Sequence, residues 1–182
     1  NEIDAAAALL ATAERPLILC GGGPVIARGG AEVTALAERL GAVVATSISG
    51  QSVILDDHPL ALGVVGANGG APETRRVLDD ADLVLAVGCR LGSVTTERWR
   101  HPRTGVKLVH IDADPGVIGA NYPTDRALVG DARATLTKLV EALAHQPERR
   151  DGAEARARVA AAKREKRERF LALAHSSEMP IR

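Results

Sequence analysis

Three consecutive glycines, Gly21-Gly22-Gly23, are the first residues in the sequence whose type and spacing could serve a ligand. They follow the apolar run 16–20, and a helical pattern begins at Ala31. Glycines at such a turn let the main chain approach a phosphate, and the free N–H groups of a following helix can bind it. The same glycines would equally satisfy a tight turn between a strand and a helix. Both roles stay open at the level of the sequence.

These glycines do not complete the fingerprint of a nicotinamide dinucleotide site. With Gly21 and Gly23 as its first pair, the third glycine would fall at position 26, which is Ile26. The acidic residue that binds ribose hydroxyls near the end of the second strand is replaced here by Thr46 and other polar residues. A nucleotide at this turn is therefore expected to thread differently from NAD.

Glycine or polar residues also follow the later apolar runs. Ligands of a parallel sheet lie beyond the carboxyl ends of its strands, so we expect these loops to meet at one edge. The candidates there are Thr46, Ser47 and Ser49, Asn68 and Gly69, Gly88, Cys89 and Arg90, Asp112, Ala113 and Asp114, and Gly130 and Asp131. The acidic residues follow the last two runs, where an adenosine end could lie.

Several of these residues have a plainer role available. Asp131 precedes a helical pattern, and Asp114 is followed by Pro115, so both are predicted first as helix caps. Arg90 could pair with a carboxylate, and His58 and His110, which lack the spacing of metal ligands, are predicted to be structural. The sequence offers no nucleophile–base pair, paired carboxylates or Cys/His cluster. It predicts a binding platform with no catalytic residue and no metal site.

The elements that position these residues alternate between strands and helices. Strands are predicted at 16–20, 42–47, 81–88, 106–112 and 126–131, with a sixth, shorter one at 61–66. Helices are predicted at 3–13, 31–40, 72–78, 115–120 and 132–144. The strand runs are continuously apolar, as expected when both faces of a parallel sheet are covered. The prediction is an α/β fold with a doubly wound, mostly parallel six-stranded sheet and right-handed crossovers.

The sequence changes character after Gln146. A breaker at 146–152 precedes an alanine-rich and charged helix, and residues 148–169 hold nine Lys/Arg against five Asp/Glu. Glu154–Arg158 and Glu165–Arg169 are spaced for i,i+4 ion pairs on a solvated helix. No aromatic side chain is interleaved with these charges to stack on bases, so a surface helix or connector is favoured over a nucleic-acid arm.

Composition limits the classes of function. The 182 residues carry no formal net charge, which favours neither nucleic acid nor an acidic membrane as a partner. Cys20 and Cys89 are too few for a disulfide scaffold, and no apolar run reaches the roughly 18 residues of a membrane helix. A reducing, cytoplasmic setting is therefore expected. The chain begins at Asn1, which suggests a piece of a larger protein, although a trimmed tag explains the start equally simply.

The loops taken together resemble the central domain of thiamine diphosphate-dependent enzymes, with the acetolactate synthase-like branch the most similar. The resemblance rests on "RPLILCGGGPVIARGGAEV", "GAVVATSISGQSVILDDHPLALGVVG", "ADLVLAVGCRLGSVTTERW" and "KLVHIDADPGVIGANYPTDRALVGDA" in that order. It covers residues 12–146, and the segment after it resembles the connection to a third domain. We therefore expect a central nucleotide-binding-type domain at 1–146 and a charged linker helix at 147–182. In fold terms, this implies a Rossmann-like sheet of the DHS-like NAD/FAD-binding type.

The resemblance implies a part of an enzyme and not a complete one. In the family, a first domain supplies the glutamate that activates thiamine diphosphate, and a third binds its diphosphate through Mg²⁺ with a Gly-Asp-Gly motif. Neither feature is found in this sequence, because Gly-Asp-Ala at 130–132 lacks the second glycine. The implied parent is a 2-keto acid carboligase or decarboxylase. Its implied partners are the N- and C-terminal domains of the same chain and further copies in a dimer or tetramer.

FAD occupies the central domain in acetolactate synthases, and the resemblance carries its contacts onto this sequence. They are Gly21, Gly22 and Gly23, then Thr46, Ser47, Ile48 and Ser49, Asn68 and Gly69, Gly88, Cys89 and Arg90, Asp112 and Ala113, and Gly130 and Asp131. The flavin branch has Arg-Phe-Asp-Asp-Arg where Arg90 is followed here by Leu91-Gly92. Relatives that keep the fold bind FAD, ADP, a CoA portion or nothing, so FAD and ADP are both expected candidates.

Two other functions compete with this one. The first is a stand-alone FAD-binding module of the electron-transfer flavoprotein type, against which the terminal linker counts. The second is a protein-deacetylase or deoxyhypusine synthase-like NAD enzyme with a similar sheet, against which the missing acid–base residues count.

Overall fold

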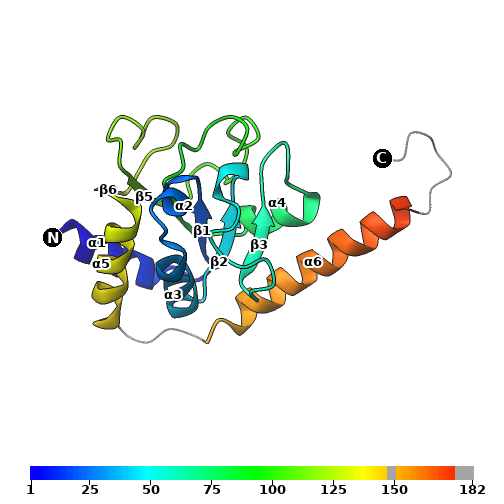
Figure 1. Cartoon of the computed structure of the whole chain (residues 1–182), viewed down its shortest axis with the longest axis horizontal. Coiled ribbons are helices and arrows are strands. Elements are labelled where there is room, and N and C mark those ends of the chain that lie inside the picture. The colour runs from blue at the N-terminus through cyan, green and yellow to red at the C-terminus, as the bar shows by residue number, and fades with distance from the viewer. Residues whose placement is uncertain (147–150, 175–182) are drawn as a thin grey trace.

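A six-stranded parallel sheet forms the centre of the molecule, for which a computed structural model describes residues 1–146 and 151–174 (Figure 1). The strands lie in the order β3-β2-β1-β4-β5-β6, and every neighbouring pair is parallel. Their bounds are β1 (Pro16–Cys20), β2 (Val43–Thr46), β3 (Ala61–Val64), β4 (Leu83–Val87), β5 (Lys107–Asp112) and β6 (Arg126–Val129). All six predicted strands are confirmed, including the shorter run at 61–66.

Burial explains why the strands could be recognised. Every residue of β1, β2 and β4 is buried, so these strands carry apolar side chains on both faces. In the central register Ile18 lies between Val44 of β2 and Leu85 of β4. Helices on both faces of a parallel sheet require such continuous apolar runs.

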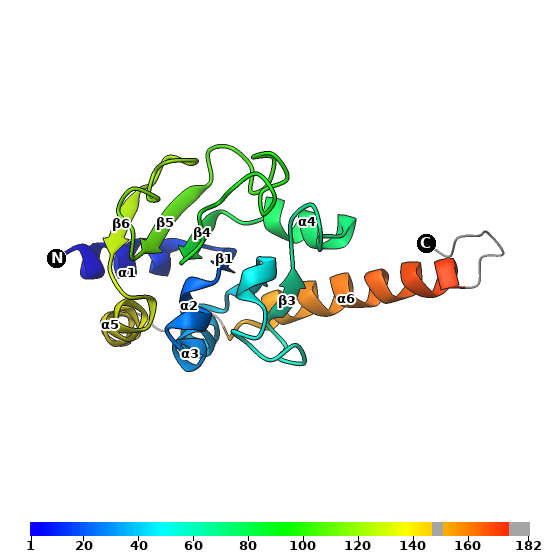
Figure 2. The ribbon, with the colours of Figure 1, turned by 45° about the horizontal axis from the view of Figure 1, so that its top comes forward.

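Helices pack on the two sides of this sheet. They are α1 (Glu2–Thr12), α2 (Gly23–Ile26), α3 (Gly30–Leu40), α4 (Pro72–Asp79), α5 (Ala132–Ala144) and α6 (Ala153–Ala174), with a 3-10 turn at Ile48–Gly50. The α5 helix packs against α1 and α3, and α4 packs against α6. Figure 2 shows α3 and α5 on one side of the strands and α4 on the other. The doubly wound α/β prediction is therefore confirmed.

The helix predicted at 115–120 is wrong, because this segment forms consecutive turns. Asp114 does not cap a helix there; its Oδ1 accepts a hydrogen bond from the Gly116 N–H at 2.9 Å, which closes a local turn. Gly119 then adopts a left-handed φ of +79°, which a right-handed helix does not contain. A segment of six residues with two glycines has too little to gain from helix formation.

The charged segment after Gln146 does form a helix, α6, whose carboxyl half projects beyond the sheet (Figures 1 and 2). The predicted ion pairs along this helix are wrong, since Arg158, Glu165 and Arg169 pair instead with residues of α4 or the residue that follows it. Arg158 lies 3.6 Å from the Asp80 carboxylate, Arg169 lies 3.2 Å from Glu73, and Glu165 pairs with Arg76. Residues 147–150 and 175–182 of the predicted linker lie outside the described residues.

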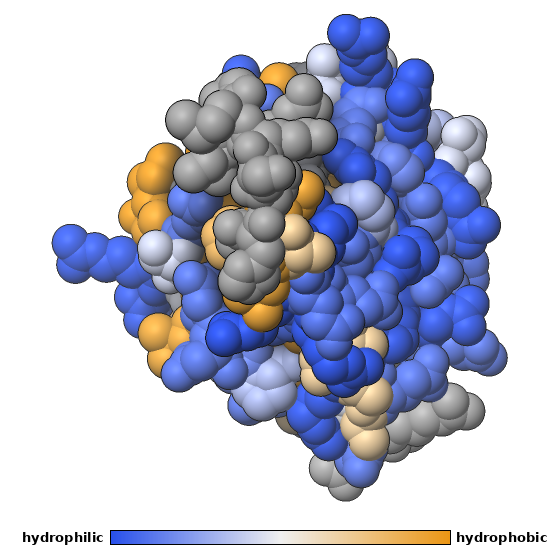
Figure 3. Space-filling model, turned by 90° about the vertical axis from the view of Figure 1, so that its right-hand side faces the viewer, coloured by the Kyte–Doolittle hydropathy of each residue, from blue (hydrophilic) through white to orange (hydrophobic). Residues whose placement is uncertain are grey.

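The projecting end of α6 carries apolar side chains among its charges. Phe170, Leu171 and Leu173 are exposed there. In Figure 3, which looks onto this side of the molecule, hydrophobic side chains lie in separate groups on a mostly hydrophilic surface. None of the helices in residues 1–146 and 151–174 is long and apolar enough to cross a membrane.

Small and branched aliphatic side chains fill the core, as the scarcity of aromatic residues requires. Cys20 and Cys89 are both buried within it and carry free thiols. Burial raises the pKa of each thiol above its ordinary value, so both behave as small apolar groups.

Candidate functional site

The glycine turn after β1 and the loop after β4 meet at the carboxyl edge of the sheet. The chain passes from β1 outward through β2 to β3 and then returns to β4 on the other side of β1. Strand order therefore reverses between β1 and β4, which is where open α/β sheets bind ligands. The Gly23 N–H donates to the Gly88 carbonyl at 3.2 Å, so the two loops are joined directly.

Two adjoining hollows extend along this edge. The first, the hydroxyl hollow, has a volume of about 680 Å³ and is lined by Gly21, Gly22, Gly23, Ile26, Ser47, Ser49, residues 88–95 and Asn121. The second, the acidic hollow, has a volume of about 500 Å³ and is lined by Gly23, Ile26, Ala27, Gly88, Arg90, residues 112–114, Val117, Asp131 and Ala132. They share Gly23, Ile26, Gly88 and Arg90. The two adjoining hollows are called the groove below, and Arg90 borders both of them.

Most of the sequence-predicted binding residues line this groove, but five do not. Thr46, Ile48, Asn68, Gly69 and Gly130 contribute to neither hollow. Thr46 is buried, whereas Ile48 and Asn68 face solvent away from the lining. Whether any of them contacts a ligand stays a prediction.

Packing accounts for two of the three glycines. A Cβ on Gly21 would overlap the carbonyl oxygen of Gly88, and a Cβ on Gly23 would lie 2.6 Å from the Gly88 Cα. Gly22 differs, because its Cβ would lie 3.4 Å from the Ser49 Cβ, an ordinary contact at the lining of the hydroxyl hollow. The turn thus needs Gly21 and Gly23 to pass the β4 loop, whereas packing leaves room for a side chain at Gly22.

Arg90 is the one charged side chain that lines both hollows. Its guanidinium makes no hydrogen bond or ion pair with any residue in the described ranges 1–146 and 151–174. The plainer role considered for it, pairing with a carboxylate, is therefore not found there. An unpaired, forked cation in a groove is suited to binding two oxygens of a phosphate or carboxylate.

The acidic residues of the second hollow are partly used by the backbone. Asp131 Oδ1 accepts from the Ala134 N–H at 2.9 Å and caps α5, which confirms its predicted capping role. Asp112 Oδ1 accepts from the Asp114 N–H at 3.0 Å. The second oxygen of each carboxylate makes no hydrogen bond within the described residues, and it is available to accept from hydroxyl groups.

Sequence reasoning missed several residues that line the groove, chiefly 93–95 and Asn121. Asn121 follows the segment wrongly predicted as a helix, and its side chain reaches back to the β4 loop, donating to the Arg90 carbonyl at 2.8 Å. No local pattern signals such a contact, because 31 residues separate the two groups.

The two isolated histidines hold backbone groups, in agreement with their predicted structural role. His58 Nδ1 accepts from the Leu60 N–H at 3.2 Å, and the Nε2 of His110 lies 3.0 Å from the Cys89 carbonyl oxygen. His110 is buried, and burial lowers its pKa below the ordinary value despite the opposing attraction of Asp112.

A pH dependence of stability follows from the lowered pKa of His110. The unfolded chain takes up this proton near the ordinary pKa of about 6.5, whereas the folded chain resists it. The His110 contribution is therefore complete above about pH 6.5 and lost as the pH falls below it, by up to about 1.4 kcal/mol per pH unit. We expect urea midpoints measured between pH 7.5 and 5.5 to fall less in His110→Gln than in the unchanged chain. Parallel slopes in the two proteins would contradict this assignment.

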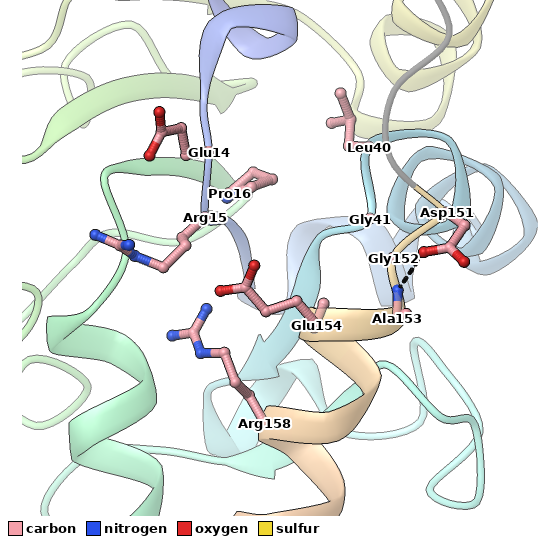
Figure 4. A pocket seen from close by; sticks show the side chains of 11 residues that line it. Glu14, Arg15, Pro16, Leu40, Gly41, Asp151, Gly152, Ala153, Glu154 and Arg158 are labelled. Carbon is pink, nitrogen blue, oxygen red and sulfur yellow. Dashed lines mark hydrogen bonds between the residues drawn. The ribbon is translucent and has the colours of Figure 1, made fainter.

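Another cavity, of about 420 Å³, lies at the opposite edge of the sheet (Figure 4). It is lined by 14–16 at the start of β1, by Leu40 and Gly41 after α3, and by the first turns of α6. The side chains of Glu154 and Arg158 point toward one another there, whereas the Arg15 Nε donates to the Asp80 carbonyl oxygen at 2.8 Å. Asp151 Oδ1 accepts from the Ala153 N–H at 2.9 Å. None of the predicted binding residues lines this cavity. It lies where α6 meets the body of the domain.

Metal-binding groups are not gathered in either place. Within residues 1–146 and 151–174, no cluster of three or more His, Cys, Asp or Glu side chains could hold an ion. The groove therefore offers a cation, hydroxyls and carboxylates for hydrogen bonding, without a metal centre of its own.

Comparison with known proteins gives a consistent result. Residues 3–139 match the family model described as the thiamine pyrophosphate enzyme, central domain. The chain is 37% identical to a probable acetolactate synthase large subunit of Methanococcus aeolicus over 79% of its own length and 24% of the relative's. It is 41% identical to a probable 2-ketoarginine decarboxylase of Pseudomonas aeruginosa over 86% and 26% of the two lengths. A sulfoacetaldehyde acetyltransferase of Rhodobacter capsulatus is 32% identical over 98% and 30%. The chain thus spans between 24% and 30% of the length of these relatives.

Proposed function

Because the chain belongs to the family of thiamine pyrophosphate enzyme central domains, we propose that it serves as the central, nucleotide-binding domain of a larger enzyme that acts on 2-keto acids. The names of two relatives, a probable acetolactate synthase large subunit and a probable 2-ketoarginine decarboxylase, support this proposal. We further propose that domains on either side of it, and other copies of the parent chain, complete the enzyme. The proposed domain boundary lies at Gln146.

Thiamine diphosphate and Mg²⁺ do not fit this part of the enzyme. Asp131 is the only acid of the Gly-Asp-Ala sequence at 130–132, and it is already used as the cap of α5. No metal-binding cluster exists among the described residues. We propose that the cofactor pair, which supplies the carbanion chemistry of the family, is held by other domains of the parent.

The groove fits an adenine nucleotide better. Arg90 has an unpaired guanidinium between the two hollows, where it would bind a diphosphate, and this observation carries the proposal. Asp112 and Asp131 each have a carboxylate oxygen left to accept from ribose hydroxyls in the acidic hollow. Ser47 and Ser49 line the other side, where the remainder of FAD would extend. ADP, alone or as part of FAD, is the proposed ligand.

Removing Arg90 tests this site. We expect Arg90→Ala to weaken ADP binding, measured by isothermal calorimetry, by about 1–3 kcal/mol, because one charge-assisted contact to phosphate is lost. FAD should lose a similar amount. Arg98→Ala is the matched control, since Arg98 is also exposed but lines neither hollow.

Equal ADP affinity in Arg90→Ala and in the unchanged chain would assign Arg90 to another role. Equal losses in Arg90→Ala and Arg98→Ala would mean that the net charge of the surface, and not the groove, attracts the nucleotide.

A further inference from the structure

Arg90 is held on a sharply turned segment. Gly88 and Leu91, on either side of the Cys89-Arg90 pair, both have left-handed backbone angles, with φ of +51° and +50°. For Leu91 this conformation is unfavourable, yet its side chain is almost completely buried and fixes the turn. The surrounding structure must therefore hold this segment in place.

The peptide group that precedes Arg90 is bound by His110. The Nε2 of this histidine lies 3.0 Å from the Cys89 carbonyl oxygen, and a carbonyl oxygen only accepts, so Nε2 carries the hydrogen. His110 is in β5, which pairs directly with β4, and only 1% of it is exposed. The donor thus comes from the rigid centre of the sheet.

The peptide group that follows Arg90 is bound by Asn121. Its Nδ2 donates to the Arg90 carbonyl oxygen at 2.8 Å from the loop between β5 and β6. Asn121 also lines the hydroxyl hollow. The carbonyl groups on both sides of the Arg90 Cα are therefore held by side chains from two other segments.

Core packing alone accounts poorly for a histidine at position 110. Its Nδ1 is buried and makes no hydrogen bond within the described residues, which costs free energy. The neighbouring positions of β5, Val109 and Ile111, fill the core with apolar side chains that carry no such cost. A histidine here is explained if its other nitrogen performs a task that an aliphatic residue could not.

We propose that His110 and Asn121 are positioning residues, which clamp the two peptide groups around Arg90 and preorganise its guanidinium for a phosphate. This inference rests on the proposed nucleotide site, whose affinity would otherwise be reduced by the cost of ordering the loop. The two residues act through the main chain, so neither needs to contact the nucleotide.

A double-mutant cycle measures the clamp. We expect Asn121→Ala and His110→Leu each to weaken ADP binding about three- to tenfold in calorimetry, because one hydrogen bond to the loop is lost. In an Arg90→Ala background the same changes should have no further effect on affinity. His110→Gln, which keeps a side-chain N–H donor, should recover most of the loss. Equal fold losses in both backgrounds would overturn the proposal, because a general structural defect does not depend on Arg90.

A ligand-free measurement separates this inference from the proposed function. Amide hydrogen exchange at residues 89–92 should be faster in Asn121→Ala than in the unchanged chain, while exchange in β1 stays the same. Asn121 is exposed, so this variant is expected to fold even if His110→Leu does not. Unchanged exchange at 89–92 would overturn the clamp. Failure of the unchanged chain to bind ADP would instead overturn the nucleotide site and leave exchange to decide the clamp.

Discussion

Replacing Gly21 with alanine is expected to destabilise the domain by about 3 kcal/mol, which would lower Tm by roughly 6–12 °C. The new methyl group would overlap the Gly88 carbonyl oxygen and lie 2.7 Å from the Cys89 Cα. Both neighbours are backbone atoms of a loop that is bonded to β5 through the Gly88 N–H and the Ile111 carbonyl at 2.8 Å. The clash therefore has no flexible side chain to displace, and thermal unfolding followed by circular dichroism would measure its cost.

Gly22→Ala is the matched control for this prediction. Gly22 has a φ of −73°, which any residue adopts, and its Cβ would meet only Ser49, at 3.4 Å from the side chain and 3.7 Å from the carbonyl oxygen. We expect a stability change within about 0.5 kcal/mol. Equal melting temperatures for the two variants would show that the β4 loop moves aside, and that packing does not require Gly21.

The same pair of variants separates the two roles that the sequence left open for the glycine turn. If Gly22→Ala folds normally but loses ADP affinity, glycine at 22 serves the ligand by letting the main chain approach it. If it folds and binds as before, all three glycines serve the turn itself.

The sheet could be predicted because its signal is local. A strand that is buried on both faces requires a continuous apolar run, such as 16–20 or 81–88. The apolar runs alone therefore indicated where the strands lie. The helix predicted at 115–120 does not form, because only the signal for its start is present. Asp114 and Pro115 resemble a helix start, but a segment this short with two glycines cannot extend a helix.

For the charged helix on the outside of the molecule, too, local sequence patterns predicted the element but not its contacts. Spacing correctly indicated a helix at α6, but it could not indicate that Glu165 and Arg169 would pair with α4. Arg169, for example, bonds to Glu73, which lies 96 positions away in the sequence. An i,i+4 spacing predicts an ion pair only where no other element places a closer group of opposite charge.

The groove was predicted only in part, because its geometry depends on which loops become neighbours. Gly88 and Arg90 were predicted as binding residues because they follow a strand, and the structure places them beside the glycine turn. The hydrogen bonds that hold the main chain around Arg90 could not be predicted in that way. His110 and Asn121 have no distinguishing spacing, and their role arises only when β5 and its following loop lie against the end of β4.

The chain supplied with pyruvate, thiamine diphosphate and Mg²⁺ is expected to show no carboligase or decarboxylase turnover. The resemblance to the family implies that the activating glutamate and the metal-diphosphate motif belong to other domains, and the described residues hold no metal-binding cluster. Enzymes typically accelerate their reactions by about 10⁶-fold or more, and a chain that does not bind the cofactor lacks the chemistry behind such a factor. Pyruvate consumption should therefore match that of a buffer control, in an assay calibrated with a complete acetolactate synthase.

Calorimetry with thiamine diphosphate and Mg²⁺ gives a second reading, in which we expect no heat of binding from this chain. Turnover above the control, or saturable cofactor binding, would contradict the proposal that the catalytic machinery belongs to the neighbouring domains of the parent.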